Sequence, residues 1–309
     1  MYISIIISTC NRPQKLKSCL NSIGIAKLIY TKNTEVIVVD QSDNNQTQKI
    51  VKQTNYLIKY TRITKKNLSF ARNIGIKHSK GKIIAFTDDD CLVDKNWLKN
   101  INQSFDKHKN IIALFGQVKA YQASSHKHLI CPCTFERKKQ KIISKACKHS
   151  TNIGFGNNMA FRKNAFCNFE GYNINGFKEW LGLGSIGMSA EDAEMPLRLL
   201  INKHQILYNP RVKVFHNRWI TKEEFKSICF SYNCGETACY GYFAFQNQKF
   251  AKQIIKNIFS DSYRKLRKNL LLLKTTQFNI KTLSYNLQEL FFRIRGLIVG
   301  FYFAIKKTI

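Results

Sequence analysis

Residues 81–91 read Gly81-Lys82-Ile83-Ile84-Ala85-Phe86-Thr87-Asp88-Asp89-Asp90-Cys91. A mostly apolar run that follows a glycine and stops at polar residues predicts a β-strand buried on both faces. Such a strand belongs inside an α/β sheet, and open α/β sheets bind their ligands at the carboxyl ends of the strands. We therefore expect the ligand site of this protein to lie at the end of this strand.

Three consecutive carboxylates, Asp88 to Asp90, follow the predicted strand. Carboxylates this close repel each other, and burial adds a desolvation cost. A divalent cation that prefers hard oxygen ligands, Mn²⁺ or Mg²⁺, would neutralise them. A turn or a helix cap would also place a single aspartate here. Three in a row favour a metal site.

Strands alternate with helices from the first residues onward. Ile3–Thr9 and Glu35–Val39 are predicted strands, and the helix between them has Pro13 in its first turn, a favoured place for proline. Ser69 is the expected N-cap of a second helix. This alternation predicts a doubly wound, mostly parallel sheet. Further predicted strands are Tyr56–Ile63, Ile111–Ala120, Asn152–Phe161, Gln205–Tyr208 and Val212–Phe215.

Right-handed crossovers place the ends of the strands before residues 10, 40 and 88 on one edge of the sheet. Thr9 to Arg12, Asp40 and Asp88 to Asp90 should therefore converge in a crevice that suits a nucleotide diphosphate and a metal ion. The first strand is not followed by G-x-G-x-x-G, which excludes a dinucleotide-binding Rossmann site. A P-loop is excluded as well, because no glycine-rich run ends in Lys-Ser or Lys-Thr.

A second acidic group, Glu191 and Asp192, follows the glycine-rich stretch of residues 181–189. These acids open a predicted helix, where negative charge also suits the helix dipole. Both a catalytic and a purely helix-stabilising role are open at this point.

A series of short motifs runs along residues 1–220: Ser8-Thr9-Cys10-Asn11-Arg12, Val38-Val39-Asp40, Ala71-Arg72-Asn73-x-Gly75, Thr87-Asp88-Asp89-Asp90, Leu181-Gly182-x-Gly184, Glu191-Asp192-Ala193-Glu194-x-x-x-Arg198, Tyr208-Asn209-Pro210 and Val214-Phe215-His216. Taken in order, these motifs resemble those of the family 2 glycosyltransferases, which have the GT-A fold. Where members of that family often have a glycine before the second acidic motif, this chain has Ser189-Ala190.

The resemblance implies a role for each motif. Asp90, with Asp88 and His216, would bind Mn²⁺ or Mg²⁺, although His216 would also fit a packed strand end. Asp192 would be the general base, with Glu191 as the second candidate. The residues implied in binding the nucleotide sugar are Thr9, Asn11, Arg12, Asp40, Arg72, Asn73, Asp88 and Asp89.

The function implied by the resemblance is metal-dependent, inverting sugar transfer. The donor would be a UDP- or dTDP-sugar, and the acceptor a hydroxyl of a glycan or lipid-linked molecule in cell-surface polysaccharide synthesis. Two alternatives share the fold, a nucleotidyltransferase and an inactive relative. The net charge of +31 also suggests a nucleic-acid-binding protein, but the chain lacks a helix-turn-helix, RRM or zinc-finger signature, so no nucleic acid is expected.

We expect two parts, a catalytic domain at 1–220 and a basic, amphipathic, mainly helical extension at 221–309. From residue 251 onward, 12 basic residues face two acids, a net charge of +10. Basic residues interleaved with apolar clusters are typical of interfacial helices on anionic lipid. The alternative is a helical hairpin that caps the core. No run reaches the ~20 apolar residues of a membrane span, so a cytoplasmic protein, peripheral on the inner face of the membrane, is expected.

The ten cysteines are expected to be free thiols, because the N-terminal apolar run is too short for a secretory signal. One His/Cys-rich region has irregular spacings that match no standard zinc pattern, and a solvated loop is favoured over a zinc site there. It contains His126, His128, Cys131, Cys133, Cys147 and His149.

Overall fold

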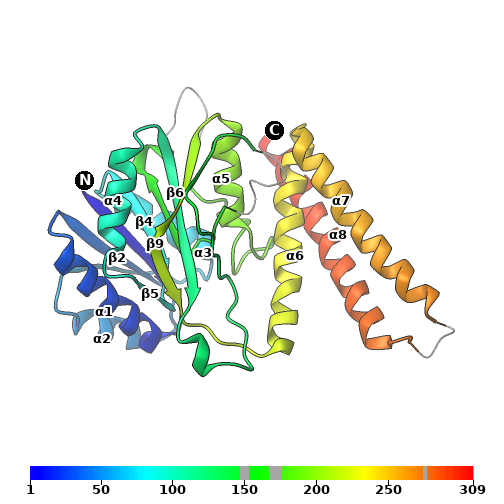
Figure 1. The fold of residues 1–309 in the computed structure, drawn as a ribbon, viewed down its shortest axis with the longest axis horizontal. Helices are drawn as coiled ribbons and strands as arrows, with labels where there is room; N and C mark the ends of the chain where they lie inside the picture. The colour runs from blue at the N-terminus through cyan, green and yellow to red at the C-terminus, as the bar shows by residue number, and fades with distance from the viewer. Residues whose placement is uncertain (147–152, 167–175, 274–276, 309) are drawn as a thin grey trace.

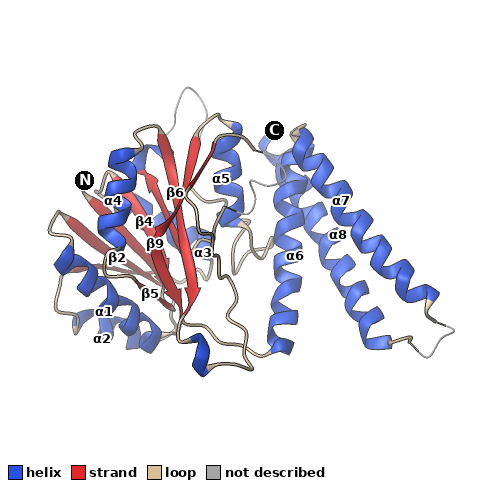
Figure 2. Ribbon diagram, viewed as in Figure 1, coloured by secondary structure: helices blue, strands red, loops and turns tan. Residues whose placement is uncertain are grey.

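The computed structural model describes residues 1–146, 153–166, 176–273 and 277–308 (Figure 1). The described residues form a nine-stranded sheet flanked by helices, with three long C-terminal helices beside it (Figure 2). The strands are β1 (Ile3–Thr9), β2 (Thr34–Asp40), β3 (Ile58–Arg62), β4 (Ile83–Asp88), β5 (Cys91–Val93), β6 (Ile111–Ala120), β7 (Lys141–Ile143), β8 (Asn158–Arg162) and β9 (Gln205–His216). The helices are α1 (Pro13–Ile29), α2 (Gln46–Lys52), α3 (Leu68–His78), α4 (Trp97–Lys107), α5 (Glu191–Ile201), α6 (Lys222–Phe245), α7 (Lys249–Leu271) and α8 (Ile280–Thr308).

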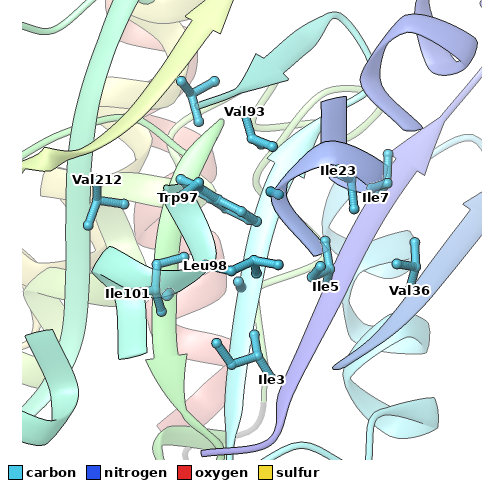
Figure 3. Packing of buried hydrophobic residues seen from close by; sticks show 14 of the residues in the cluster. Ile3, Ile5, Ile7, Ile23, Val36, Val93, Trp97, Leu98, Ile101 and Val212 are labelled. Carbon is cyan, nitrogen blue, oxygen red and sulfur yellow. The ribbon is translucent and has the colours of Figure 1, made fainter. Parts of the chain in front are cut away.

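The first half of the sheet is parallel, in the order β3-β2-β1-β4. The isoleucines of β1 alternate between two cores, as the pleat of a strand requires. Ile3, Ile5 and Ile7 belong to the cluster that α1 and α4 cover, where Trp97 is also buried (Figure 3). Ile6 lies in the opposite cluster, with side chains of α3 and α5. Burial on both faces confirms the central strands that the apolar runs predict.

The second half of the sheet is mixed. β8 runs antiparallel to both β4 and β6, whereas β6 and β9 are parallel to each other. β5 and β7 pair antiparallel with β9. The two predicted strands at 205–208 and 212–215 are one strand, β9, so that prediction is wrong. A bulge lets the strand continue past Pro210, which has no N–H to give to the ladder: Gly116 pairs with Asn209, but Gln117 pairs with Lys213.

Asn158 of β8 satisfies the backbone at this bulge. Its Nδ2 donates to Gln117 O at 2.8 Å and to Val212 O at 2.9 Å, and its Oδ1 accepts from Trp97 Nε1 at 2.9 Å. A Cβ on Gly116 would lie 2.2 Å from Val212 O, so the close approach of the strands requires glycine there. The buried polar groups of the bulge are thereby paired, as burial requires.

The N-cap of α3 is Asn67, because its side chain accepts from Phe70 N at 2.8 Å. The prediction of Ser69 as the cap is therefore wrong. Ser69 is buried, and its hydroxyl donates to Leu181 O at 2.7 Å. This bond connects the start of α3 to the glycine-rich stretch.

Helix α6 joins the sheet part to the α7–α8 hairpin. Tyr240 and Tyr242 are buried in a cluster that also contains side chains from α5, α7 and α8. Two glycines of α8 permit close packing on α6, since a Cβ on Gly296 would lie 2.1 Å from Cys234 O and one on Gly300 would lie 2.3 Å from Ala238 O. Among the described helices, none is both long enough and apolar enough to cross a membrane.

Candidate active site

The carboxyl ends of β1, β2 and β4 meet at one edge of the sheet. Thr9 is the register partner of Asp40, and Ser8 is the partner of Asp88. The three polar segments that were predicted from the sequence to converge therefore lie side by side. β4 marks the change from parallel to antiparallel pairing, a place where α/β sheets commonly bind ligands.

Asp89 fixes Arg12 at this edge. The Asp89 carboxylate is 4% exposed and accepts from Thr9 Oγ1 at 2.7 Å and from Arg12 Nη1 at 3.2 Å. Burial, together with the charge of Asp90, raises the pKa of Asp89 to about 7. The Arg12 side chain keeps 40% of its surface exposed, so it can still contact an anionic ligand while Asp89 holds it.

Asp90 and His216 form a buried pair. His216 Nδ1 lies 2.7 Å from the carbonyl of Pro132, which can only accept, so Nδ1 carries the hydrogen. Nε2 then faces Asp90 Oδ1 at 3.3 Å. Burial alone would lower the pKa of His216, but its hydrogen bond to Asp90 and the charge of that carboxylate raise it to about 10.

The donor atoms at this pair fit a divalent cation. Of the described residues, Asp90, Cys91 and His216 form one possible metal-binding group, with ligand atoms all within 4.8 Å of one another. Asp88, the other aspartate expected to bind the metal, lies outside this group; its side chain is 34% exposed and pairs with Arg72. Carboxylate donors suit Mn²⁺ and Mg²⁺, and imidazole is a common ligand of other divalent cations.

Arg72 of α3 connects the two acidic groups. Its guanidinium is 3% exposed and donates to Glu191 Oε1 at 2.7 Å and to Asp88 Oδ1 at 3.2 Å. The same group lies over the ring of Phe177, 5.5 Å from its centroid. Burial, reinforced by the charge of Asp192, raises the pKa of Glu191 to about 7. Arg72 thus offsets the repulsion between carboxylates of β4 and α5.

Asp192 stands beside this network, with its Oδ2 accepting from Gly156 N at 2.6 Å. Burial raises the pKa of Asp192, although the Arg72 charge and the Gly156 N–H act in the opposite direction. Gly156 has to be small, because its Cβ would lie 2.9 Å from Arg72 Nη2 and 3.0 Å from Asp192 Cβ. Asp192 is partly exposed, whereas Glu191 is buried, which leaves Asp192 the more accessible of the two acids.

The glycine-rich stretch leads into α5, and several of its residues have a left-handed backbone conformation. Gly182 and Gly184 have φ of +91° and +84°, conformations that glycine adopts at little cost. Ala190, where relatives often have glycine, has a φ of 73° and costs about 1–2 kcal/mol more than glycine would. Asn73 of α3 binds the segment just before this stretch, since its Oδ1 accepts from Phe177 N at 2.7 Å and its Nδ2 donates to Phe177 O at 2.9 Å.

Asp40 and Asn11 lie at the ends of β2 and β1, on the same edge of the sheet. Asp40 is fully buried, and its oxygens accept from Ser42 N at 2.9 Å and from Tyr60 Oη at 2.7 Å. Asn11 has a φ of 54° and bonds to Asp43 through both amide atoms, at 2.9 and 3.0 Å. Asn11 therefore holds the loop after β2 against the loop after β1, and Asp40 connects the start of the same loop to β3.

Sequence reasoning missed three residues of the site: Cys91, Gly156 and Phe177. The pair of glycines at 154 and 156 in a predicted strand was the available signal for Gly156, because such glycines mark close approach of other groups. The eight described cysteines are free thiols, as expected. In the His/Cys-rich region, His126 stacks on Trp219 at 4.4 Å and Cys133 Sγ lies 3.2 Å from Tyr232 Oη. Cys147 and His149 lie outside the described residues.

Solved structures share this fold. Staphylococcus aureus TarS, residues 1–349, superposes with a TM-score of 0.61 at 18% identity, over 96% of this chain and 81% of that one. The same protein in complex with UDP-GlcNAc gives 0.56 at 19% identity, over 76% and 66%. A Pyrobaculum calidifontis mannosyltransferase, PcManGT, in complex with GDP-Man and Mn²⁺, gives 0.58 at 13% identity, over 97% and 87%. The fold is the GT-A-type α/β fold expected from the sequence.

Curated proteins match by sequence over part of the chain. The poly(ribitol-phosphate) beta-N-acetylglucosaminyltransferase TarP of Staphylococcus aureus is 27% identical over 119 residues, which cover 37% of this chain and 36% of that protein. The chain spans about a third of the length of the curated relatives that it matches first. Residues 4–169, just over half of the chain, match the family Glycosyl transferase family 2, and we conclude that the chain belongs to this family.

Proposed function

We propose that this protein transfers a sugar from a nucleotide diphosphate donor to an acceptor hydroxyl, with inversion at the anomeric carbon. The observation that carries the proposal is the pairing of two acidic groups through Arg72: Asp88 on the β4 side and Glu191, next to Asp192, on the α5 side. In such a site, one acidic group could bind the metal ion of a nucleotide diphosphate, and the other could supply a general base close to it. Family membership and the nucleotide-sugar complexes of TarS and PcManGT support this reading.

The half of the site that binds the donor would use residues at the ends of β1, β2, β4 and β9. Asp88, Asp90 and His216 would hold the cation, Mn²⁺ or Mg²⁺, which when bound would act as a Lewis acid that neutralises the departing diphosphate. Arg12 is held by Asp89 with part of its surface exposed, and it would contact the same phosphates. Thr9 orients Asp89, because its hydroxyl donates a hydrogen bond to the Asp89 carboxylate. Asp40 and Asn11 would serve the nucleoside end, because they fix the loop that borders it.

The acceptor half would use Asp192. Its carboxylate takes the proton of the acceptor hydroxyl as that oxygen attacks the anomeric carbon. The bond between that carbon and the diphosphate oxygen breaks on the opposite face, which inverts the configuration. Three residues would position this half of the site, since they connect α5, α3 and the segment before the glycine-rich stretch: Glu191, Arg72 and Asn73. The acceptor would be a glycan or a lipid-linked molecule of a cell-surface polysaccharide, in keeping with the named substrate of TarP.

A panel of UDP-, dTDP- and GDP-sugars tests the donor and the metal together. We expect a UDP- or dTDP-sugar to bind in Mn²⁺, to be hydrolysed slowly, and to be released by EDTA. Asp90→Asn should lose the Mn²⁺-dependent binding and keep the fold. Asp106→Asn, which changes an exposed acid in the last turn of α4, is the control. The proposal fails if no member of the panel binds, or if Asp90→Asn binds a nucleoside diphosphate in Mn²⁺ as tightly as the unchanged protein.

We further propose that residues 221–309 form a separate part that binds the surface of an anionic membrane. A row of exposed apolar side chains runs along α8 at helical spacing, and it includes Leu287, Phe291, Ile294, Ile298, Tyr302 and Ile305. Phe291 and Ile298 are 62% and 63% exposed. In Figure 1, α7 and α8 extend away from the sheet. An exposed apolar row on a hairpin with many basic residues suits an interfacial helix.

Sedimentation with lipid vesicles tests this attachment. The protein should pellet with anionic vesicles at low salt, less with neutral ones, and be released by high salt because the attraction is screened. Phe291→Ser combined with Ile298→Ser should abolish pelleting. A control that combines Leu28→Ser with Leu57→Ser, at positions 82% and 88% exposed on the sheet part, should pellet normally. Equal pelleting of both double variants would contradict attachment through α8.

A further inference from the structure

Cys91 is the one possible metal ligand of the crevice that the proposed function leaves unused among the described residues. It follows the three aspartates directly, begins β5, and is fully buried. In the antiparallel pairing of β5 with β9, its register partner is His216. Directly opposite residues of antiparallel strands project their side chains from the same face. Strand pairing therefore brings a thiol, an imidazole and the neighbouring Asp90 carboxylate together on a rigid part of the fold.

The separations within this group resemble those of a tetrahedral metal site. Metal–oxygen and metal–nitrogen bonds of about 2.0 Å and metal–sulfur bonds of about 2.3 Å place tetrahedral ligands about 3.3–3.5 Å apart. Asp90 Oδ1 lies 3.3 Å from His216 Nε2 and 3.9 Å from Cys91 Sγ. The third separation, from Cys91 Sγ to His216 Nε2, is within 4.8 Å, so side-chain shifts of up to about an ångström would bring all three atoms into bonding distance of one ion.

The remaining polar atoms of these side chains are already held by other groups. Asp90 Oδ2 accepts from Arg12 Nη1 at 3.0 Å, which directs Oδ1 toward His216. His216 Nδ1 bonds to Pro132 O, which leaves Nε2 as the nitrogen that can bind a metal. Groups that hydrogen-bond to metal ligands in this way orient the ligands and strengthen metal binding.

We propose that Asp90, Cys91 and His216 bind a thiophilic divalent cation, Zn²⁺ or Co²⁺, with the sulfur of Cys91 as a direct ligand. Thiolate and imidazole ligands favour Zn²⁺ over Mg²⁺ and Mn²⁺, which prefer oxygen. The thiol proton of Cys91 and the Nε2 proton of His216 both pass to the buffer as the metal–sulfur and metal–nitrogen bonds form. The inference rests on the proposed function only in placing a cation at Asp90; it adds that Zn²⁺ displaces Mn²⁺ from that position.

Co²⁺ is the probe for a sulfur ligand, because a cobalt–thiolate bond gives an intense charge-transfer absorption in the near ultraviolet. One equivalent of Co²⁺ should produce this band in the full-length protein, and Zn²⁺ should remove it by competition. Cys91→Ser should lose the band and bind Zn²⁺ at least 10- to 100-fold more weakly. Even the loss of a residue that only hydrogen-bonds to a metal ligand usually weakens metal binding by this factor. Cys229→Ser should keep both, because Cys229 is a free thiol of α6 that lies outside the ligand group.

X-ray absorption of the unchanged protein loaded with one Zn²⁺ makes the test independent of any variant that fails to fold. A sulfur neighbour at about 2.3 Å is expected. The inference is wrong if Co²⁺ does not bind, if it binds without the charge-transfer band, if Cys91→Ser keeps the band, or if zinc has only nitrogen and oxygen neighbours. No sugar donor is present in either measurement, so a failed donor panel with an intact band would overturn the transferase proposal and leave this one standing.

Discussion

Replacing Asp192 by Asn should lower turnover by about 10²–10⁴-fold, the usual contribution of a general base. The fold should survive, because an Asn side-chain oxygen can still accept the hydrogen bond that Gly156 N donates to Asp192 Oδ2. Donor binding should also survive, since the residues proposed for the donor lie on the β1, β2 and β4 side of Arg72. Steady-state rates with a working donor and acceptor, together with donor affinity by calorimetry, measure the two effects separately.

The pH profile gives a second readout of the same variant. A general base works when it is ionised, so the rate falls as the pH drops through its pKa. Burial raises the pKa of Asp192 above its usual value and that of Glu191 to about 7. The acid limb of the profile should therefore lie above the range of an exposed carboxylate, with an apparent pKa that belongs to the pair. Asp192→Asn should flatten this limb.

Glu223→Gln is the matched control for a helix-stabilising role. Glu223 is an exposed acid in the first turn of α6, as Asp192 is an acid in the first turn of α5. Loss of a favourable dipole interaction costs only about 0.3–1 kcal/mol, so its turnover should not change. If Asp192→Asn stays within a few-fold of the unchanged protein, Asp192 merely stabilises the helix and Glu191 becomes the candidate base.

The central strands were predictable because their residues are apolar on both faces. β1 begins and ends where the apolar run predicts, and β4 ends on the predicted acid. The convergence of Thr9, Asp40 and Asp88 followed from crossover handedness alone. These features depend on the local composition of the chain and on the right-handedness of crossovers between parallel strands. The first can be read from a single sequence, and the second applies to any sequence.

What the sequence did not reveal depends on pairing between distant residues. β9 passes Pro210 only because Asn158 of another strand satisfies the bulge. Cys91 lies beside His216 because β5 pairs with β9, more than a hundred residues later. Arg72 was expected beside the diphosphate, but its ion pair with Glu191 requires the approach of α3 and α5, which no local pattern encodes.

Replacing Arg72 by Met should lower the free energy of unfolding by about 3–5 kcal/mol above pH 8, because it removes one partner of a buried ion pair. Glu191, 6% exposed, would then lack its cation while Asp88 and Asp192 remain close. Methionine fills most of the space, so the loss reflects charge more than a cavity. Urea unfolding followed by circular dichroism at pH 5.5 and pH 8.5 measures it.

The loss should shrink in acid. The pKa of Glu191 in the folded protein, about 7, exceeds its usual value of 4.5, so acidification stabilises the folded state as the pH falls from about 7 toward 4.5. Without Arg72 that pKa rises further, and Arg72→Met gains more from acidification than the unchanged protein does. Arg162→Met is the control, because Arg162 donates to backbone carbonyls such as Ile111 O and Phe105 O, and its effect should vary little with pH. An equal loss at both pH values in Arg72→Met would mean that Arg72 stabilises the fold by packing, and that the carboxylates of β4 and α5 do not depend on its charge.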